Sequence, residues 1–152
     1  MLNLPENRIA VLDGAMGTML QKKGLPLGKC PEALNLTHPE EIVSIHRAYA
    51  HAGAQILYAN TFGANRRKLA GSGYEVRDVV AAGMRCMKEA ARETGARAAL
   101  CCGPIGALLE PNGSLRFDEA YDIFREVVVA GAEAGADLIV FETMTDLLEI
   151  KA

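Results

Sequence analysis

The sequence predicts an α/β fold built from parallel β/α units, which together form about half of a (β/α)8 TIM barrel. Three helix-like stretches end in Gly-Ala directly before an apolar strand, and the glycines are Gly53, Gly95 and Gly135. They lie 42 and 40 residues apart (95 − 53 and 135 − 95). Two of the strands that follow end in a polar residue, Asn60 and Glu142. Folds of this kind place their functional groups at the carboxyl ends of parallel strands, so the repeated pattern also predicts where a site lies.

The first predicted strand is the apolar run Arg8–Leu12, which ends at Asp13. Gly14 and Gly17 follow within a few residues, and this glycine spacing is typical of a tight turn after a strand. The segment Met19–Leu27 then predicts a short helix.

The second unit begins with a helix whose predicted N-cap is Thr37, with Pro39 in its first turn. Gly53 is placed to end this helix in the left-handed conformation. The strand Gln55–Ala59 follows directly. The apolar positions that repeat at helical spacing in this helix are Ile42, Ile45, Ala48, Tyr49 and Ala52.

The strands of the later units are apolar throughout, which predicts parallel strands buried on both faces. Right-handed crossover helices then lie on one side of the sheet, as in a barrel, or on both sides, as in a doubly wound sheet. The remaining predicted elements are a helix over 76–91, a strand at Ala98–Cys102, a helix over Phe117–Ala134, a strand at Leu138–Phe141 and a helix that begins within Thr143–Ala152.

The composition predicts one folded domain with a core, because half of the 152 residues are hydrophobic and the net charge is only −3. No Lys/Arg run stands out, which argues against nucleic acid or an anionic membrane as a partner. The longest apolar runs are too short to span a bilayer. The first eight residues lack the apolar core of a signal peptide, so we expect a cytoplasmic protein. The four cysteines form no C-x-x-C motif and are expected to be buried thiols.

Five short motifs, in order, span nearly the whole chain. They are Asp13–Thr18 (DGAMGT), Glu32–Thr37 (EALNLT), Asn60–Asn65 (NTFGAN), Gly103–Gly106 (GPIG) and Glu142–Met144 (ETM). Together they resemble the N-terminal half of the homocysteine S-methyltransferase domain family, and within it most of all the homocysteine-binding module of cobalamin-dependent methionine synthases. The resemblance implies a (β/α)8 barrel and a methyltransferase that converts homocysteine to methionine.

The resemblance also implies a zinc ion, which the family holds through three cysteines so that the homocysteine thiol reacts as a zinc-bound thiolate. Those cysteines lie in the second half of the family's barrel. Residues 1–152 are therefore expected to be the N-terminal half of the domain, truncated before its zinc ligands. Cys101-Cys102 is similar to the family's adjacent pair, but Ala99-Leu100 stand where the family has two glycines. We expect no metal site in this chain.

Two further expectations follow from the resemblance. The methyl donor is unknown, and in the family cobalamin and methyltetrahydrofolate are carried by other modules. Without the zinc ligands, we expect no complete catalytic site and no useful rate of methyl transfer from this polypeptide alone. Conversion of homocysteine to methionine by the purified chain would overturn that expectation.

Five residues are the candidates for substrate binding. Asp13 and Gly14 resemble the family's first homocysteine contact, in which the carboxylate faces the substrate ammonium and the backbone of the turn receives its carboxylate. Glu142 ends an apolar strand and matches a family glutamate that binds the amino group of homocysteine. Asn60 and Thr61 follow the second strand and are expected to line the pocket. The structural alternatives are a turn residue for Asp13, an ion pair for Glu142 and a loop-ordering network for Asn60 and Thr61.

Other functions stay open at this point. The chain is alternatively a non-catalytic module that binds a small ligand, and homocysteine binding indifferent to zinc would favour that function. Its open sheet edges invite self-association, or pairing with a missing C-terminal half-barrel, to complete eight strands. A monomeric size in solution would count against self-association. A doubly wound domain that binds a phosphorylated ligand at the Gly14/Gly17 turn is disfavoured, because the G-x-G-x-x-G spacing is absent.

Overall fold

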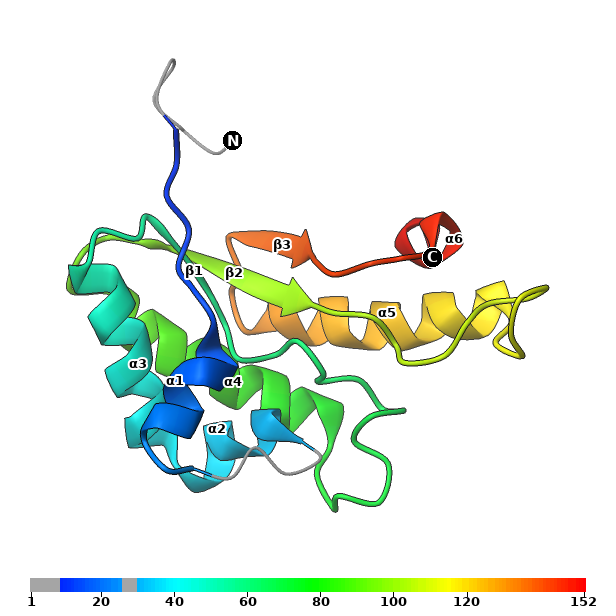
Figure 1. Ribbon diagram of the computed structural model, residues 1–152, viewed down its shortest axis with the longest axis horizontal. Helices are drawn as coiled ribbons and strands as arrows, with labels where there is room; N and C mark the ends of the chain where they lie inside the picture. The colour runs from blue at the N-terminus through cyan, green and yellow to red at the C-terminus, as the bar shows by residue number, and fades with distance from the viewer. Residues whose placement is uncertain (1–8, 26–29) are drawn as a thin grey trace.

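The computed structural model describes residues 9–25 and 30–152. It confirms the α/β class, with three strands that pair in parallel in the order β1-β2-β3 (Figure 1). The strands are β1 (Ile56–Tyr58), β2 (Arg97–Cys102) and β3 (Leu138–Phe141). The helices are α1 (Met16–Lys22), the 3-10 turn η1 (Pro31–Ala33), α2 (Leu34–Thr37), α3 (Pro39–His51), α4 (Val76–Ala91), α5 (Phe117–Glu133) and α6 (Leu147–Lys151).

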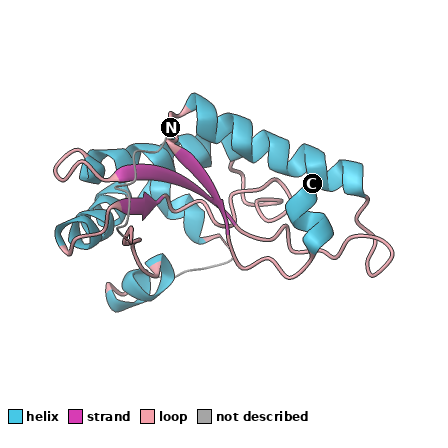
Figure 2. Ribbon diagram, turned by 90° about the horizontal axis from the view of Figure 1, so that it is seen from above, coloured by secondary structure: helices cyan, strands magenta, loops and turns pink. Residues whose placement is uncertain are grey.

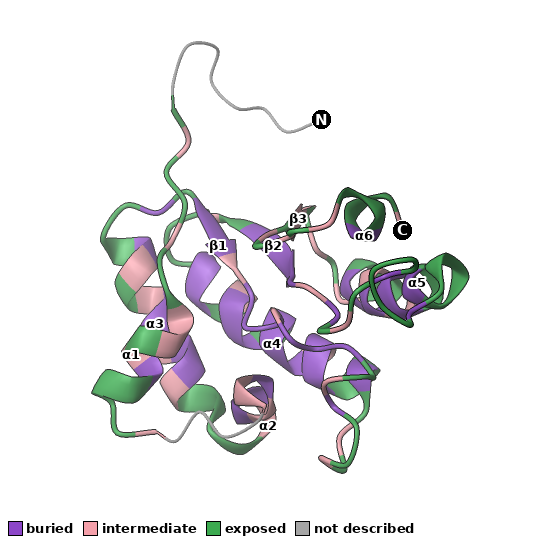
Figure 3. Ribbon diagram, turned by 45° about the vertical axis from the view of Figure 1, so that its right-hand side comes forward, coloured by how far each residue is buried: buried purple, intermediate pink, exposed green. Residues whose placement is uncertain are grey.

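The crossover helices α4 and α5 lie with α3 on one face of the sheet (Figures 1 and 3). Between them and the strands is the main core, to which Leu57, Leu100, Val80, Met84 and Val127 contribute. Figure 3 shows the buried residues concentrated on α4, β1 and β2. Figure 2 shows the strands side by side from above. Of the two arrangements left open by the sequence, helices α3, α4 and α5 therefore follow the one-sided arrangement.

Left-handed glycines end the helices that precede the strands, as the repeated Gly-Ala pattern predicts. Gly53, Gly95 and Gly135 have φ angles of +102°, +74° and +78°. Glycine adopts such angles without the steric cost that a Cβ atom imposes. Each glycine reverses the chain so that the next strand starts directly. None of the described helices combines the length and apolar character needed to cross a bilayer.

The prediction of a first strand at Arg8–Leu12 is wrong for the described residues. Leu12 forms a single parallel bridge to Ile56, and Arg8 lies outside the described part of the chain. The backbone pairing is limited to Val11–Asp13: the Val11 carbonyl accepts from the Gln55 N–H at 2.8 Å, and the Asp13 N–H donates to the Ile56 carbonyl at 3.1 Å. Ile9 is 91% exposed, and the lack of packing explains why a regular strand does not form.

Two smaller predictions also need correction. Thr37 is the last residue of α2, and His38 is the N-cap of α3, although Pro39 occupies the first turn as predicted. The predicted helix Met19–Leu27 begins earlier, at Met16, and ends at Lys22, while residues 26 and 27 lie outside the described part.

The prediction that all strands are buried on both faces holds for β2 but is wrong for β3. All residues of β2 except the first are buried, whereas Ile139 and Phe141 of β3 are 39% and 41% exposed. The reason is that β3 is the edge strand of the described sheet. The ring of Phe141 packs edge-on against Phe124 of α5 at 5.8 Å but keeps part of its surface open.

Candidate functional site

A cleft of about 380 Å³ lies at the carboxyl ends of the strands. It brings together four of the five predicted site residues. Asp13 and Gly14 come from the segment after the Leu12 bridge, Asn60 follows β1, and Glu142 follows β3. Tyr58 and Cys101 also line the cleft. Parallel strands deliver their carboxyl ends to the same edge, and this topology explains why residues so distant in the sequence meet here.

Asp13 is held at the rim by the backbone of β1. The N–H of Tyr58 donates to its Oδ2 atom at 3.0 Å, while Oδ1 is buried without a hydrogen-bond partner among the described residues. Burial raises the pKa of the Asp13 carboxyl to about 6, and the nearby negative charge of Glu142 adds to the rise. The hydrogen bond from the Tyr58 N–H acts in the opposite direction and lowers this pKa. A buried carboxylate oxygen without a donor is a group that a bound cation would satisfy.

The raised pKa makes Asp13 a source of pH-dependent instability. Between the ordinary pKa of 3.8 and about 6, the folded chain holds a proton that the unfolded chain releases. The contribution of Asp13 to stability therefore falls as the pH rises through this window. We expect Asp13→Asn to raise the melting temperature at pH 7.5 and to change it little at pH 4.

The measurement is thermal unfolding of wild type and Asp13→Asn across this pH range. The difference between the two chains is needed because His46 acts in the opposite direction. Burial lowers its pKa to about 4, so its contribution to stability is lost as the pH falls below its ordinary value of 6.5. A difference in melting temperature that does not change with pH would contradict the role given to Asp13.

Glu142 reaches the cleft from the end of β3 and contacts the thiol of Cys101. The Cys101 Sγ atom donates to Glu142 Oε1 at 2.9 Å. Burial, and then the hydrogen bond to Glu142, raise the pKa of the Cys101 thiol far above its ordinary value. Thr143, the next residue, has a φ angle of +62°. Such an angle is strained for a β-branched residue, and strain of this kind occurs at functional sites.

The side chain of Asn60 belongs to a buried hydrogen-bond network with Asn35 of α2. Asn60 Nδ2 donates to Asn35 Oδ1 at 2.9 Å, and Asn35 Nδ2 donates to the Asn60 carbonyl at 2.8 Å. Asn35 Nδ2 also donates to the carbonyl of Val79 in α4 at 3.2 Å. The network joins the loop after β1 to two helices and fixes the wall of the cleft.

Thr61 is buried behind the cleft and is not among the residues that line it. Its hydroxyl donates to the Cys101 carbonyl at 2.8 Å and accepts from the Cys101 N–H at 3.2 Å. These bonds continue the sheet beyond the last residue of β1. In the structure, the contacts of Thr61 position Cys101.

Sequence reasoning missed two buried polar residues, Glu32 and Asn35, although both lie in the motif Glu32–Thr37. Glu32 is 5% exposed, and its Oε1 atom accepts the Gly63 N–H at 2.6 Å. A Cβ atom at Gly63 would lie 2.8 Å from Glu32 Oε1, so a side chain there would displace the Glu32 carboxylate. The sequence feature that indicates them is the presence of a charged residue and an amide among the apolar residues of this motif.

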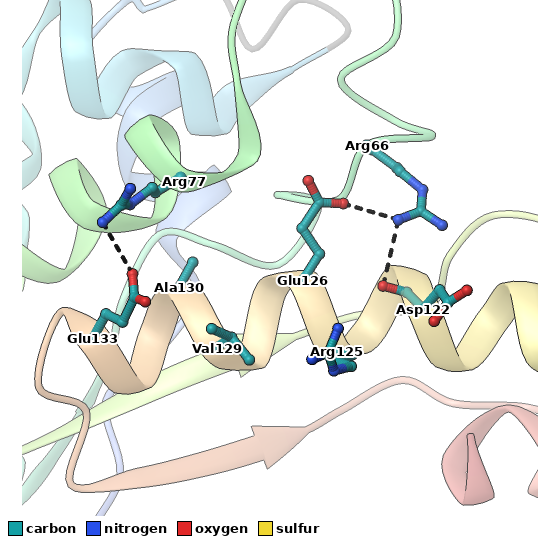
Figure 4. Close-up of a pocket in the computed structure, with 8 residues that line it drawn as sticks. All are labelled: Arg66, Arg77, Asp122, Arg125, Glu126, Val129, Ala130 and Glu133. Atoms are coloured by element: carbon teal, nitrogen blue, oxygen red, sulfur yellow. Dashed lines mark hydrogen bonds and ion pairs between the residues drawn. The ribbon is translucent and has the colours of Figure 1, made fainter.

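A second hollow, of about 500 Å³, lies between α5, the start of α4 and the loop at Arg66 (Figure 4). Its polar side chains are largely paired with each other. Arg66 pairs with Glu126 at 3.2 Å, and Arg77 pairs with Glu133 at 3.2 Å. Surface ion pairs such as these contribute little to stability. The hollow lies away from the strand ends, so the Asp13–Glu142 cleft is the candidate site.

The described residues do not fit a zinc ion. Within residues 9–25 and 30–152, no three His, Cys, Asp or Glu side chains are grouped as metal ligands. Cys101 lines the cleft, whereas Cys102 belongs to the core between the sheet and the helices. Neighbouring strand residues point to opposite faces, so the two thiols cannot bind one ion together. A structural zinc site needs four ligands and a catalytic site three.

Comparison with known proteins shows which family this chain resembles in sequence and in fold. Residues 10–152 match the sequence profile described as "Homocysteine S-methyltransferase". The chain is 34% identical to methionine synthase of Mycobacterium tuberculosis over 166 aligned positions, and 34% identical to that of Mycobacterium leprae over 157. These alignments cover 100% and 95% of this chain but only 14% and 13% of the relatives.

Solved structures of the homocysteine methyltransferase MmuM from Escherichia coli have the same fold over the aligned part. The metallated form aligns with a TM-score of 0.84, covering 95% of this chain and 57% of that chain at 24% identity. The apo form aligns with a TM-score of 0.75, covering 96% and 53%. The chain thus spans little more than half of these structures.

Proposed function

Because the chain belongs to the homocysteine S-methyltransferase family, we propose that the Asp13–Glu142 cleft binds the amino-acid part of homocysteine. The observation that carries the proposal is the pair of carboxylates in the cleft, Asp13 after the Leu12 bridge and Glu142 after β3, of which Asp13 has a buried oxygen without a donor among the described residues. The ammonium group of homocysteine would supply donors and a positive charge to both. Charge-assisted hydrogen bonds of this kind are among the strongest in proteins.

The turn at Gly14 is the proposed binding place for the carboxylate of homocysteine. Gly14 packs against the ring of Tyr49, where a Cβ atom would lie 2.9 Å from the ring edge. Tyr49 in turn donates from its hydroxyl to the Ala15 carbonyl at 3.2 Å. We place the substrate carboxylate at the backbone N–H groups of this turn, because backbone amides of tight turns bind anions.

The proposed reaction is transfer of a methyl group to the homocysteine sulfur. In a complete family domain, a sulfur electron pair would form the S–CH3 bond while the donor keeps the pair of the bond that breaks, and the thiol proton would go to water. The described residues do not fit the zinc ion of the family, since no three of their His, Cys, Asp or Glu side chains group as metal ligands. We therefore propose that this polypeptide binds homocysteine without turning it over at a useful rate. The methyl donor stays open, and the family resemblance offers cobalamin and methyltetrahydrofolate, on other modules, as candidates.

Calorimetry of the 152-residue chain tests the proposal. We expect it to bind homocysteine and to bind 4-mercaptobutanoate, which lacks the amino group, at least about 10-fold more weakly, since a hydrogen bond to a charged group contributes about 1.5–3 kcal/mol. The binding is expected to be unchanged by a zinc chelator. Equal affinity for the two thiols, or no binding of homocysteine, would contradict the proposal.

The open edge of the sheet supports the proposal that further β/α units pack against it, from a second copy or from a C-terminal half-barrel. Besides Ile139 and Phe141 of β3, the residues Leu147 and Ile150 of α6 are 75% and 45% exposed. Exposed apolar side chains next to an edge strand favour association. The size of the chain in solution, by sedimentation, tests whether a second copy fills this place.

A further inference from the structure

The adjacent cysteines of β2 have different surroundings, although both are buried. Cys101 is 2% exposed and Cys102 is 3% exposed. The Cys101 thiol lies in the cleft, 2.9 Å from Glu142 Oε1. The Cys102 side chain packs with the apolar residues between the sheet and the helices, and burial raises its pKa to about 12. The Cys101 thiol thus contacts a carboxylate, whereas the Cys102 thiol packs against apolar side chains.

We propose that Cys101 is a positioning residue for Glu142, whose carboxylate it holds in the cleft by donating the S–H proton to Oε1. The inference deepens the proposed function, because it explains how the carboxylate assigned to the substrate ammonium is kept in place. The hydrogen bond itself does not depend on which ligand binds.

Glu142 is tied to β2 at two points. Its backbone N–H donates to the Cys102 carbonyl at 3.1 Å, and its side chain accepts from Cys101. Cys101 is in turn fixed through its own backbone, by both hydrogen bonds to the Thr61 hydroxyl. The left-handed Thr143 follows directly and limits the backbone on the other side. The Glu142 side chain is therefore held in one arrangement before any ligand arrives.

The direction of the hydrogen bond follows from the charges around it. The ionisable groups that act on the Cys101 thiol are Glu142, Cys102 and Asp13, which would all be negative when deprotonated. Tyr58 of β1 faces the same groups. Burial and this acidic environment keep the proton on sulfur. Cys101 is then a donor to the carboxylate and is not a nucleophile or a metal ligand.

The S–H stretching band in the infrared spectrum tests the bond without any ligand. We expect two resolvable bands for the β2 thiols, with the Cys101 band, assigned by its loss in Cys101→Ala, shifted to lower frequency. Glu142→Gln replaces the charged acceptor by a weaker neutral one, so the Cys101 band should move up. The Cys102 band, assigned by Cys102→Ala, should stay in place. A Cys101 band that is unshifted, or that ignores Glu142→Gln, would overturn the inference.

Homocysteine binding tests the positioning role. We expect Cys101→Ala to weaken binding roughly 3- to 10-fold, the range for loss of one ordinary hydrogen bond. Cys101→Ser keeps a donor of similar size and should restore most of the affinity. Cys102→Ala is the matched control, which should lower stability but leave affinity unchanged. Equal losses in Cys101→Ser and Cys101→Ala would reject a role for the donor.

The two kinds of measurement separate this inference from the proposed function. If the wild-type chain binds no homocysteine, the proposed function fails, and the infrared bands alone decide whether Cys101 holds Glu142. If homocysteine binds but the Cys101 band is unshifted, the proposed function stands and the positioning role fails.

Discussion

Replacing Glu142 by glutamine is expected to weaken homocysteine binding by about 30-fold, or about 2 kcal/mol. This is the low end of the cost of removing one partner of a buried charge pair, because the cleft is partly open to water. Glutamine keeps a carbonyl oxygen that can accept from Cys101, but it loses the negative charge that faces the substrate ammonium. The measurement is calorimetry at pH 8, where Asp13 is ionised in the folded chain because its pKa is about 6.

The matched control for this prediction is Glu126→Gln on α5. Glu126 pairs with Arg66 on the surface, at 3.2 Å, so the same chemical change there removes a charge outside the cleft. We expect this control to bind homocysteine as the wild type does. Wild-type affinity in Glu142→Gln would contradict the proposed contact with the ammonium, and an equal loss in both variants would show an effect of net charge only.

The sequence predicted most of the features that depend on local chemistry. Gly53, Gly95 and Gly135 end helices because of their freedom in φ, and this property is visible in the sequence. Asp13 and Glu142 follow apolar runs, and this position predicts that they meet at one edge of a parallel sheet, while their assignment to homocysteine comes from the family resemblance. Whether either residue contacts homocysteine stays a prediction.

The features that the sequence did not predict depend on the neighbours that an element has in space. The apolar run before Asp13 has strand composition, but nothing described covers Ile9, so only Leu12 pairs. β3 likewise has the composition of a central strand and lies at an edge. The contact of Cys101 with Glu142 joins residues 41 positions apart, and periodicity contains no information about such pairs.

The Asn35 network is the other feature that local patterns did not indicate, and Asn35→Leu is expected to lower the free energy of unfolding by about 3 kcal/mol. Leucine has a similar shape but no polar atoms, so Asn60 loses both an acceptor and a donor in a buried site. The side chain at position 35 packs closely against Gly83 of α4, where an added Cβ atom would lie 2.6 Å from Asn35 Nδ2. Urea unfolding gives the free energy.

Asn35 connects the loop after β1 to α4, and Asn65 provides a comparison because its hydrogen bonds stay within one loop. Asn65 is also buried, but its Oδ1 atom accepts only from the N–H groups of Arg67 and Lys68, in its own loop. We expect Asn65→Ala to cost about 1 kcal/mol, as for an ordinary hydrogen bond. The Asn35→Leu variant should also bind homocysteine more weakly, because Asn60 lines the cleft. Equal costs for the two variants would mean that the helices hold the cleft wall without Asn35.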